Sequence, residues 1–384
     1  MTTRPVTLEQ LSADPHPLLH ALRRASPVAW VPALDGWLVT SHELCKQVML
    51  DSETFTVDDP RFSTQQVIGP SMLSLDGLEH RRHRDPFVPA FTASRIRGLE
   101  ESASERAIRF VEDVRAGGAG DLRARVAAPL AVAMMAEILD LRGGQADELL
   151  DWYDAIVDAV HVVTAGGRVP ESGRRAFDEL RSVVLADSER SALLAPIASA
   201  GTMETDEIVS NVAVLLFGGI VTTDASISIA FRHLLEDPSR LEELQADRTL
   251  IATFTEETLR LEPSASAVDR YATRDIEIGG APVTEGDLVR VSLSAANRDP
   301  DVFTNPDELD LARRRPGKSL TFARGPHACL GVHLARLEID VAVRAVLDGL
   351  PGLRAGRLEP VAGLVFRAPR TVNAVWPGNG GVDN

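Results

Sequence analysis

The stretch Phe322-Ala-Arg-Gly325-Pro-His327-Ala-Cys329-Leu-Gly331-Val-His-Leu-Ala335-Arg336 changes character halfway along. Its first half breaks regular structure, because Gly325 opens unusual backbone angles and Pro326 has no backbone donor. Its second half has the apolar periodicity of a helix from Leu330 onward. Cys329 is therefore predicted at a junction between a loop and a helix N-terminus, where the helix dipole favours a thiolate. A cysteine in this place can be a nucleophile, a metal ligand or an ordinary buried side chain.

The composition is typical of a soluble globular protein. Of the 384 residues, 44% are hydrophobic and 25% are charged. No linker, repeat or low-complexity tract divides the chain, so we expect one domain over residues 1–384. The net charge of −16 argues against nucleic acid or an anionic membrane as a partner, because both would be repelled. The longest apolar run, residues 212–221, is too short to span a bilayer, and residues 1–5 open no signal peptide.

The two cysteines, Cys45 and Cys329, lie far apart in different contexts. This suits a reducing cytoplasm without a disulfide framework. Cys45 is expected to be a buried or half-buried helix residue. The chain contains no nucleophile elbow, phosphate-binding glycine loop or dinucleotide fingerprint. We therefore expect no flavin or nicotinamide site, and electrons, if used, must come from another protein.

The hydrophobic period predicts a mainly α fold with small β-sheets near the start and in the last third. Residues 51–75 carry few helical signals and are predicted to be a loop. The predicted helices cover residues 7–25, 41–50, 77–87, 94–115, 123–140, 145–163, 171–190, 206–236, 238–246, 249–261 and 330 onward. The predicted strands cover residues 28–31, 37–40, 267–271, 276–278 and 287–291, with two or three weak strands within 353–376.

The opening stretch resembles the cysteine-ligand loop of the cytochrome P450 family, Phe-x-x-Gly-x-His/Arg-x-Cys-x-Gly-x-x-x-Ala-Arg. The matching residues are Phe322, Gly325, His327, Cys329, Gly331, Ala335 and Arg336. Ala323 departs from the family, which usually has Gly, Ser or Asn there. The resemblance implies the cytochrome P450 fold, a single triangular domain with haem b buried between the Thr222 helix and the helix after Cys329. It also implies that Cys329 is the axial thiolate ligand of the iron.

The predicted helix 206–236 contains two adjacent glycines, Gly218 and Gly219, which cost roughly 1 kcal/mol each relative to alanine. Close packing against another helix would explain them. The stretch also resembles the family's oxygen-binding bend, Ala/Gly-Gly-x-Asp/Glu-Thr-Thr, with Thr222 and Thr223 as its alcohols. Its acid position is Val221, which cannot carry protons. Either Thr222 works through ordered water or a substrate hydroxyl, or the reaction is not plain hydroxylation.

Glu257 and Arg260 lie three apart in a predicted helix and can pair on one face. Alone, this pattern fits a solvated surface pair. It also resembles the family's Glu-x-x-Arg pair, which is buried and braces the cysteine side of the haem. The family often adds an arginine from a later segment, but Glu308 stands at that position. The third partner is therefore missing or supplied by another residue such as Arg313.

Further cationic and donor groups match the family's contacts to the haem propionates: His80, Arg84, Arg270 and His327. Carboxylates near an apolar pocket need such charge-assisted partners. Without the resemblance, His80 with His83 could hold zinc, although no further ligands stand at suitable spacing. A solvated basic helix start is the other interpretation. The run Asn297-Arg298-Asp299-Pro300 also follows the family's order.

The resemblance implies a cytoplasmic, monomeric haem-thiolate monooxygenase. It would oxidise a medium-sized organic substrate, such as a secondary metabolite, with dioxygen and electrons from a ferredoxin and its reductase. Arg81, Arg82 and Arg324 could form a positive docking patch. The substrate pocket is expected to draw on residues 57–75, 160–169, 212–223, 264–268 and 362–365.

Two alternatives remain at this stage. Within haem proteins, Val221 leaves room for a peroxide-driven enzyme, or for radical coupling, nitration or desaturation. From a different class, the chain could be a cysteine-nucleophile hydrolase or a non-catalytic helical binding protein. The second alternative predicts a colourless purified protein.

Overall fold

The computed structural model describes residues 6–141, 146–164, 167–187, 190–313 and 318–378. The chain forms two compact units. The first contains residues 1–56, 101–128 and 222–384, and the second contains residues 57–100 and 129–221. Helix α12, Thr205–Leu235, begins in the second unit and ends in the first. Gly218, Gly219 and Val221 therefore belong to the second unit, whereas Thr222 and Thr223 belong to the first.

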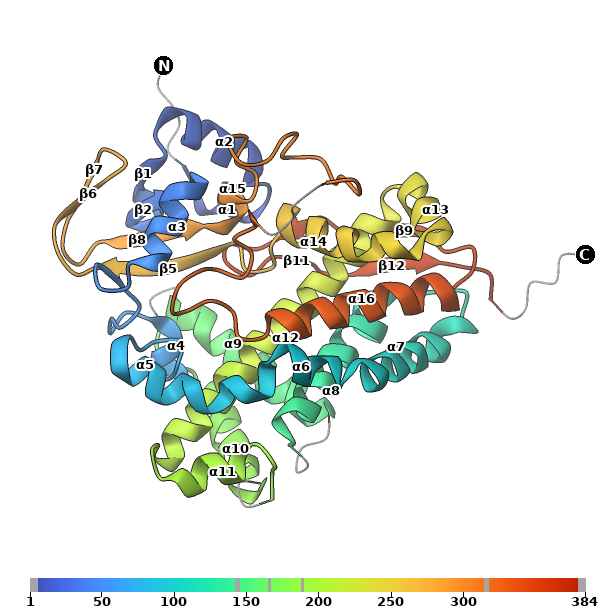
Figure 1. Ribbon diagram of the computed structural model, residues 1–384, viewed down its shortest axis with the longest axis horizontal. Coiled ribbons are helices and arrows are strands. Elements are labelled where there is room, and N and C mark those ends of the chain that lie inside the picture. Colours follow the sequence, from blue (N-terminus) through green and yellow to red (C-terminus); the bar gives the residue numbers. More distant parts are fainter. Residues whose placement is uncertain (1–5, 142–145, 165–166, 188–189, 314–317, 379–384) are drawn as a thin grey trace, which may run out of the picture. The chain divides into compact units, whose positions relative to one another are not determined.

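The first unit is built around a five-stranded sheet of order β1-β2-β8-β5-β3 (Figure 1). Its strands are β1 Val28–Val31, β2 Gly36–Val39, β3 Phe55–Thr56, β5 Ala267–Ala272 and β8 Leu288–Ser292. Strands β2 and β8 pair in parallel, and the other neighbours are antiparallel. The sheet thus joins the N-terminal hairpin to strands from the last third of the chain.

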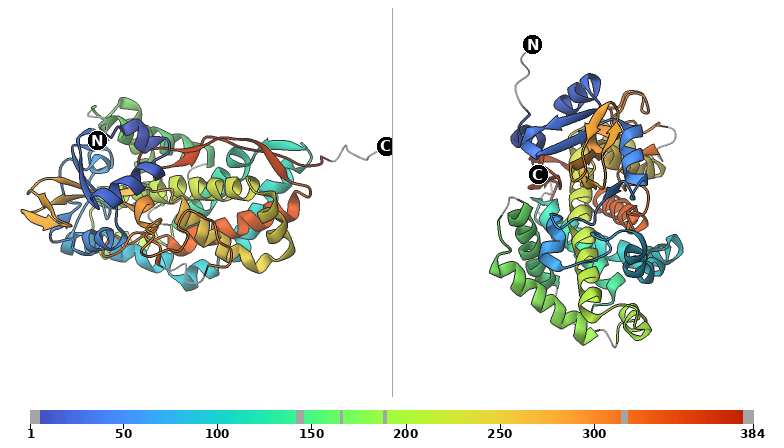
Figure 2. Two further views of the ribbon diagram at one scale, coloured as in Figure 1. Left: turned by 90° about the horizontal axis from the view of Figure 1, so that it is seen from above. Right: turned by 90° about the vertical axis from the view of Figure 1, so that its left-hand side faces the viewer.

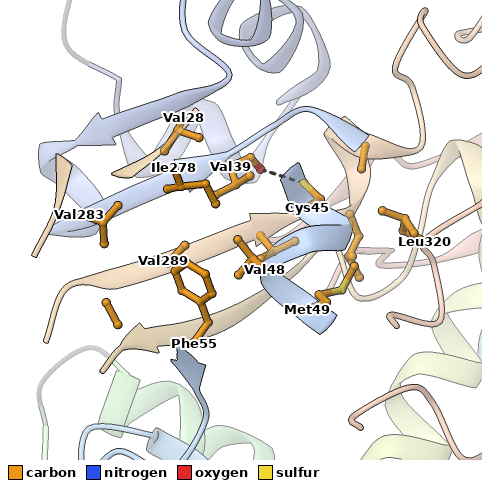
Figure 3. Close-up of a cluster of buried hydrophobic side chains, with 14 of the residues drawn as sticks. Val28, Val39, Cys45, Val48, Met49, Phe55, Ile278, Val283, Val289 and Leu320 are labelled. Atoms are coloured by element: carbon orange, nitrogen blue, oxygen red, sulfur yellow. Dashed lines mark hydrogen bonds between the residues drawn. The ribbon is translucent and has the colours of Figure 1, made fainter. Parts of the chain in front are cut away.

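One face of this sheet carries a buried apolar cluster shared with α3, His42–Leu50 (Figure 3). Cys45 lies within this cluster, and its Sγ donates to the Val39 carbonyl at 3.3 Å. Burial raises the pKa of the Cys45 thiol, so the group stays protonated and inert. This confirms that Cys45 is a buried helix residue. Leu320 and Ala323, which precede Cys329, pack in the same cluster.

Besides α3, the first unit contains helices from the N-terminal, middle and C-terminal parts of the chain. Helices α14 and α16 pack side by side (Figure 1). The helices are α1 Leu8–Ser12, α2 His16–Ala25, η1 Pro32–Leu34, α7 Glu100–Arg115 (mostly in this unit), the π-helix η3 Arg123–Ala127, α13 Pro238–Ala246, η4 Arg248–Leu250, α14 Ile251–Leu261, α15 Leu293–Ala296 and α16 Val332–Gly349. The small sheets use β4 Ala119–Asp121, β6 Ile276–Ile278, β7 Ala281–Val283, β9 Arg354–Leu358, β10 Val361–Ala362, β11 Ala368–Pro369 and β12 Val372–Val375.

In the part of it that the structure describes, the second unit is helical. Its long helices α9 and α10 lie against each other (Figure 2). Besides the start of α12, its helices are α4 Ser63–Ile68, α5 Gly77–Arg84, η2 Asp85–Phe91, α6 Ala93–Arg97, α8 Ala128–Leu139 (mostly in this unit), α9 Ala146–Thr164, α10 Glu171–Asp187 and α11 Leu194–Ala200.

Several predicted elements differ from the structure. The expected helix 7–25 opens with the predicted capping box at Thr7 but splits into α1 and α2, because Pro15 cannot continue a helix. The expected helix 94–115 divides into α6 and α7 at Gly98. Residues 51–75 are not all loop, since they contain α4. At Pro15 and Gly98 a single residue interrupts an otherwise helical period.

Helix α12 confirms the predicted helix 206–236 to within one residue at each end, and its apolar character extends beyond residues 212–221. By length and composition alone it could cross a membrane, with a mean hydropathy of 1.8. However, 78% of that window is buried inside the protein, as in the core helix of a globular fold.

Candidate functional site

Cys329 lies in the loop that leads into α16, two residues before its N-cap, Gly331. Its backbone N–H donates to the Phe322 carbonyl at 2.8 Å, and the Ala328 N–H donates to the Gly325 carbonyl at 3.1 Å. These two bonds fold the loop back on itself before the helix. Cys329 is exposed, in contrast to the buried Cys45. The structure therefore confirms the loop-to-helix junction and excludes an ordinary buried cysteine.

Two left-handed residues shape this loop. Gly325 has φ +78°, and an added Cβ would lie 2.4 Å from the Met49 carbonyl oxygen, so no larger residue fits without a backbone shift. Ala323 has φ +54°. That conformation costs an L-residue roughly 1–2 kcal/mol, a cost that glycine avoids and asparagine bears more easily. Ala323, the departure noted in the sequence, is thus a point of local backbone strain.

Polar side chains fix the start of the same loop. The side-chain Oδ1 of Asn297 accepts from the Leu320 N–H at 2.7 Å, and its side-chain Nδ2 donates to Thr321 Oγ1 at 2.8 Å. Thr321 in turn donates to the Leu259 carbonyl on α14 at 2.7 Å. Asn297 is fully buried, so these bonds are made out of water, where breaking them is costly. This gives the Asn297-Arg298-Asp299-Pro300 run a bracing role.

Glu257 and Arg260 form a fully buried ion pair, both 0% exposed, with Arg260 Nε 2.8 Å from Glu257 Oε1. The surface-pair interpretation is therefore wrong. Arg313 supplies the third partner, its Nε donating to Glu257 Oε2 at 2.8 Å, which confirms the suggested candidate. Burial raises the pKa of Glu257, but the bonds from Arg260 and Arg313 outweigh it and the pKa is lowered.

Arg260 completes the brace with its remaining donors. They reach the carbonyl oxygens of Pro306 at 2.6 Å, Glu308 at 2.8 Å and Asn297 at 3.1 Å. Glu308 thus takes part through its backbone, although its side chain replaces the family's arginine. The buried Arg260 guanidinium thus has hydrogen-bond acceptors in addition to its carboxylate partner, as a buried ion pair requires.

The paired glycines of α12 have different surroundings. An added Cβ at Gly219 would lie 2.2 Å from the Met135 Sδ of α8, so close helix packing explains this glycine. Gly218 is exposed although Phe217 and Ile220 are buried, and an added Cβ there would meet nothing within 4 Å. Packing within the protein therefore does not account for Gly218.

One turn further along α12, Val221 and Thr222 are half-buried and Thr223 is buried. Asp224 does not replace the acid missing at Val221. Its carboxylate binds Arg123 at 2.8 Å, and Arg123 also donates to the Pro369 carbonyl at 2.8 Å. Burial raises the pKa of Asp224. Its geometry is that of a brace between α12, η3 and β11.

Arg270 is buried on β5 and lies on the strand face that also bears Val268 and Ala272. Those two residues pack in the cluster that includes Leu320 and Ala323. The predicted cationic residue therefore belongs to the sheet face on which the start of the cysteine loop packs. His327, in the loop itself, is half-buried.

His80 and Arg84 lie on α5 in the second unit, His80 buried and Arg84 half-buried. The zinc interpretation finds no support, because the His83 ring contacts Asn211 at 2.9 Å and Glu207 at 3.3 Å. Burial lowers the pKa of His83, as expected for a neutral core histidine. Among the described residues no group of three or more His, Cys, Asp or Glu could hold a metal ion.

The predicted positive patch needs a correction at Arg82. This side chain binds Glu207 at 2.6 Å and Glu79 at 2.7 Å, so two carboxylates balance its charge. Arg81 is exposed on the same helix, and Arg324, in the first unit, donates to the Ser319 carbonyl at 3.1 Å.

Comparison with known proteins accounts for this set of features. A model of the cytochrome P450 family matches residues 174–349. Nocardicin C N-oxygenase of Nocardia uniformis subsp. tsuyamanensis is 34% identical over 393 residues, covering 96% of this chain and 97% of that protein. Cytochrome P450 107B1 of Saccharopolyspora erythraea is 31% identical over 366 residues, covering 87% of each chain. This chain belongs to the cytochrome P450 family.

The fold agrees with the same conclusion. The crystal structure of CalO2 superimposes with a TM-score of 0.87 at 30% sequence identity, covering 96% of this chain and 97% of that chain. The expectation of a cytochrome P450 fold is thus confirmed, and the protein is a haem-dependent oxidoreductase of the monooxygenase class. The hydrolase and non-catalytic interpretations are set aside.

The cysteine loop of this P450 suits the haem that the family implies. Its thiol is exposed, and an added Cβ at Gly331 would meet nothing within 4 Å. The buried cation Arg270 lies on the sheet face against which the loop packs. An exposed thiol and a buried cation on the sheet face against which its loop packs are groups that suit a haem iron and its carboxylates.

Sequence reasoning missed one feature of this region. Ser226 stands one turn after Thr222, and its hydroxyl donates to the Thr222 carbonyl at 2.6 Å. A serine four residues after a threonine of interest is the signal that could have found it.

Proposed function

We propose that this P450 is a haem b monooxygenase in which Cys329 is the axial thiolate ligand. The observation that carries the proposal is the exposure of the Cys329 thiol in a loop held rigid by Gly325, Asn297 and the Phe322 carbonyl. The haem, when bound, supplies activation of dioxygen for insertion of one oxygen atom into an organic substrate. The residues of the chain hold that group and control its surroundings.

The proposed roles of the cysteine-loop residues follow from their contacts. Arg336 stacks over the Phe322 ring at 4.9 Å and binds Glu256 of α14, which ties the loop to the helix behind it. Gly325 permits the turn, and Gly331 and Ala335 keep the start of α16 small. We assign His327 and Arg270, with His80 and Arg84 of the second unit, to the haem propionates.

On α12 we assign four residues to dioxygen and its protons. Gly218 leaves open space on the helix surface, and Gly219 lets α12 approach α8. Thr222 is the alcohol that would hold or pass a proton, with Thr223 beside it. Val221 offers no proton, and Asp224 is engaged by Arg123, so the relay must use water or a substrate group.

The substrate class follows from the surroundings and the relatives. Nocardicin C N-oxygenase and the 20-oxo-5-O-mycaminosyltylactone 23-monooxygenase of Streptomyces fradiae carry natural-product names. We propose that the substrate is likewise a medium-sized secondary metabolite. The pocket would draw on residues 212–223, 264–268 and 362–365, with residues 57–75 and 160–169, of which 165 and 166 lie outside the described residues.

Electrons are proposed to come from a ferredoxin-type protein, because the sequence carries no flavin or nicotinamide fingerprint. We propose that the enzyme is a cytoplasmic monomer. It needs neither nucleic acid nor a membrane, since its net charge is −16 and the apolar α12 is mostly buried.

The test of the proposal is the carbon monoxide spectrum of the reduced, haem-loaded protein. We expect a Soret band typical of thiolate ligation, lost in Cys329→Ala and kept in Cys45→Ala. Cys45 is the matched control because it is a thiol buried away from the loop. A wild-type protein without haem, or a Cys329→Ala protein with an unchanged spectrum, would overturn it.

A peroxide-driven or otherwise atypical reaction is the second candidate, and the absence of an acid at Val221 favours it. Radical coupling, nitration and desaturation belong to this group. Turnover with hydrogen peroxide alone, compared with turnover by dioxygen, ferredoxin and reductase, separates the two. Faster turnover with peroxide alone would favour the second candidate.

A further inference from the structure

Two buried hydroxyls connect α12 to the segment that follows α14. Ser226 Oγ donates to the Thr222 carbonyl at 2.6 Å and lies 3.0 Å from Ser264 Oγ. Both serines are about 95% buried, at 4% and 5% exposure. A serine hydroxyl carries one proton. Because Ser226 uses its proton in the hydrogen bond to the Thr222 carbonyl, its oxygen accepts the hydrogen bond from the Ser264 hydroxyl. The Thr222 backbone is thereby linked to a distant part of the sequence.

The Ser264 segment is in turn held against the turn between β10 and β11. The Arg367 N–H donates to the Ser264 carbonyl at 2.8 Å. Ser266 uses both its groups, its N–H donating to the Val365 carbonyl at 2.8 Å and its Oγ to the Leu364 carbonyl at 2.9 Å. The two segments assigned to the substrate pocket, 264–268 and 362–365, thus form one hydrogen-bonded unit.

Arg367 anchors this unit. It is 2% exposed, and its Nε donates to Glu262 Oε1 at 2.6 Å. Its other donors reach four backbone carbonyls, those of Ser12, Ala13, Val361 and Gly363. Glu262 also contacts the His16 ring at 2.9 Å. Such a filled set of charge-assisted bonds makes the turn rigid.

The bond from Ser226 acts directly on the turn of α12 that carries Thr222. A serine hydroxyl that donates to the carbonyl four residues back competes with the helix's own hydrogen bond and bends the helix locally. Gly218, Thr222 and Ser226 are spaced by four residues and share one face of α12. The rotamer of Ser226 is fixed because Ser264 holds its oxygen from the other side.

We propose that Ser226 and Ser264 are positioning residues that set the place of Thr222, using the Arg367-anchored segment as a fixed support. The proposal rests on the proposed role of Thr222 in proton delivery. It also means that a substrate bound against residues 264–268 or 362–365 would act on the proton-carrying alcohol through the same two hydroxyls.

A buried serine can form a hydrogen bond simply because its hydroxyl is buried, without any role in positioning another residue. A first measurement tests whether Ser226 and Ser264 are energetically coupled. The variants are Ser226→Ala, Ser264→Ala and the double variant, each in the haem-loaded protein and unfolded by urea. We expect the two single losses of stability to be clearly non-additive, because each removes the same contact. Additive losses would overturn the proposal.

The second measurement reads proton delivery without the natural substrate. The probe is cumene hydroperoxide, whose O–O bond gives 2-phenyl-2-propanol on heterolysis and acetophenone after homolysis. Since small displacements of a reacting group cost up to about 100-fold, we expect the alcohol-to-ketone ratio to fall by about tenfold in Thr222→Ala, Ser226→Ala and Ser264→Ala. Ser226→Thr keeps a hydroxyl that can donate to the carbonyl four residues earlier, so this variant should have the alcohol-to-ketone ratio of the wild type.

Ser228→Ala is the matched control, because Ser228 is a buried serine of α12 that bonds Asp224 instead. Its ratio should equal that of the wild type. A normal ratio in Ser226→Ala and Ser264→Ala beside a lowered one in Thr222→Ala would overturn the positioning role alone. An unchanged ratio in Thr222→Ala would overturn the role of Thr222 as well. These outcomes differ from a failure of the proposed haem-thiolate function, because in that case the wild-type protein itself would lack the thiolate spectrum.

Discussion

Among single residues, some polar side chains are buried where the loss of hydration lowers the stability of the folded protein. Glu338 of α16 is fully buried, and neither of its carboxyl oxygens has a hydrogen-bond partner among the described residues. Burial raises its pKa well above the usual value of 4.5. Such surroundings favour the protonated, uncharged form of the carboxyl.

Glu338 therefore predicts a pH-dependent stability. Because its pKa is raised in the folded protein, folding binds a proton, and stability is lost as the pH rises above the usual glutamate pKa. Glu338→Gln removes this titration. We expect the variant to gain about 1–3 kcal/mol relative to wild type at neutral pH, and the gain to shrink toward about pH 5. Urea unfolding of both proteins over this range measures it, and a difference that does not vary with pH would contradict the account.

Gly325 gives a second prediction at this scale. Gly325→Ala should abolish stable haem binding, because the new Cβ would press on the Met49 carbonyl and the backbone is left-handed. Gly280→Ala is the control, since Gly280 also has positive φ, +81°, but nothing within 4 Å. Haem content per protein after purification is the measurement. Normal haem content in Gly325→Ala would contradict the prediction, and an equal loss in both variants would mean that backbone strain, and not the clash, lowers haem binding.

At the scale of elements, the sequence predicted most long helices and the first hairpin, because apolar periodicity reports directly which face is buried. It failed where one residue interrupts a period, as at Pro15 and Gly98, and where a short helix such as α4 forms in a loop-like stretch. The Cys329 loop was predictable because its glycine and proline act locally. The sequence left the third partner of the Glu257–Arg260 pair open, because Arg313 is distant in sequence and comes close to Glu257 only when the chain folds.

The buried Glu257 group predicts a large cost for losing Arg313. Arg313→Ala leaves part of a buried carboxylate uncompensated, so we expect a loss of about 2–4 kcal/mol. Arg248→Ala is the control, because it breaks an ion pair with the exposed Asp348 and should cost less than about 1 kcal/mol. Urea unfolding of the two variants compares them. Similar small losses would mean that Arg313 is not part of the brace.

At the scale of the whole molecule, the charge distribution limits how a redox partner binds. The protein is acidic, with a net charge of −16, so an acidic electron donor, if the proposed ferredoxin is one, would need a local positive region to bind. Arg82 is neutralised by Glu207 and Glu79, which leaves Arg81 and Arg324 as the proposed contributors.

Charge reversal tests this docking proposal. Arg81→Glu and Arg324→Glu should each slow reduction by ferredoxin by about tenfold at low salt, and the difference should shrink at high salt. Arg354→Glu, at an exposed position of β9, is the control and should leave the rate unchanged. Stopped-flow reduction under carbon monoxide gives the rates. Equal slowing by all three variants would indicate net charge rather than a docking site.

The proposed binding of the haem iron by Cys329 can be tested by exchanging the ligand. In Cys329→His the loop and α16 stay in place while an imidazole replaces the thiolate. We expect a haem-loaded variant whose reduced carbon monoxide band moves from the thiolate position to that of histidine-ligated haem. A variant that binds haem and keeps the thiolate band would contradict it.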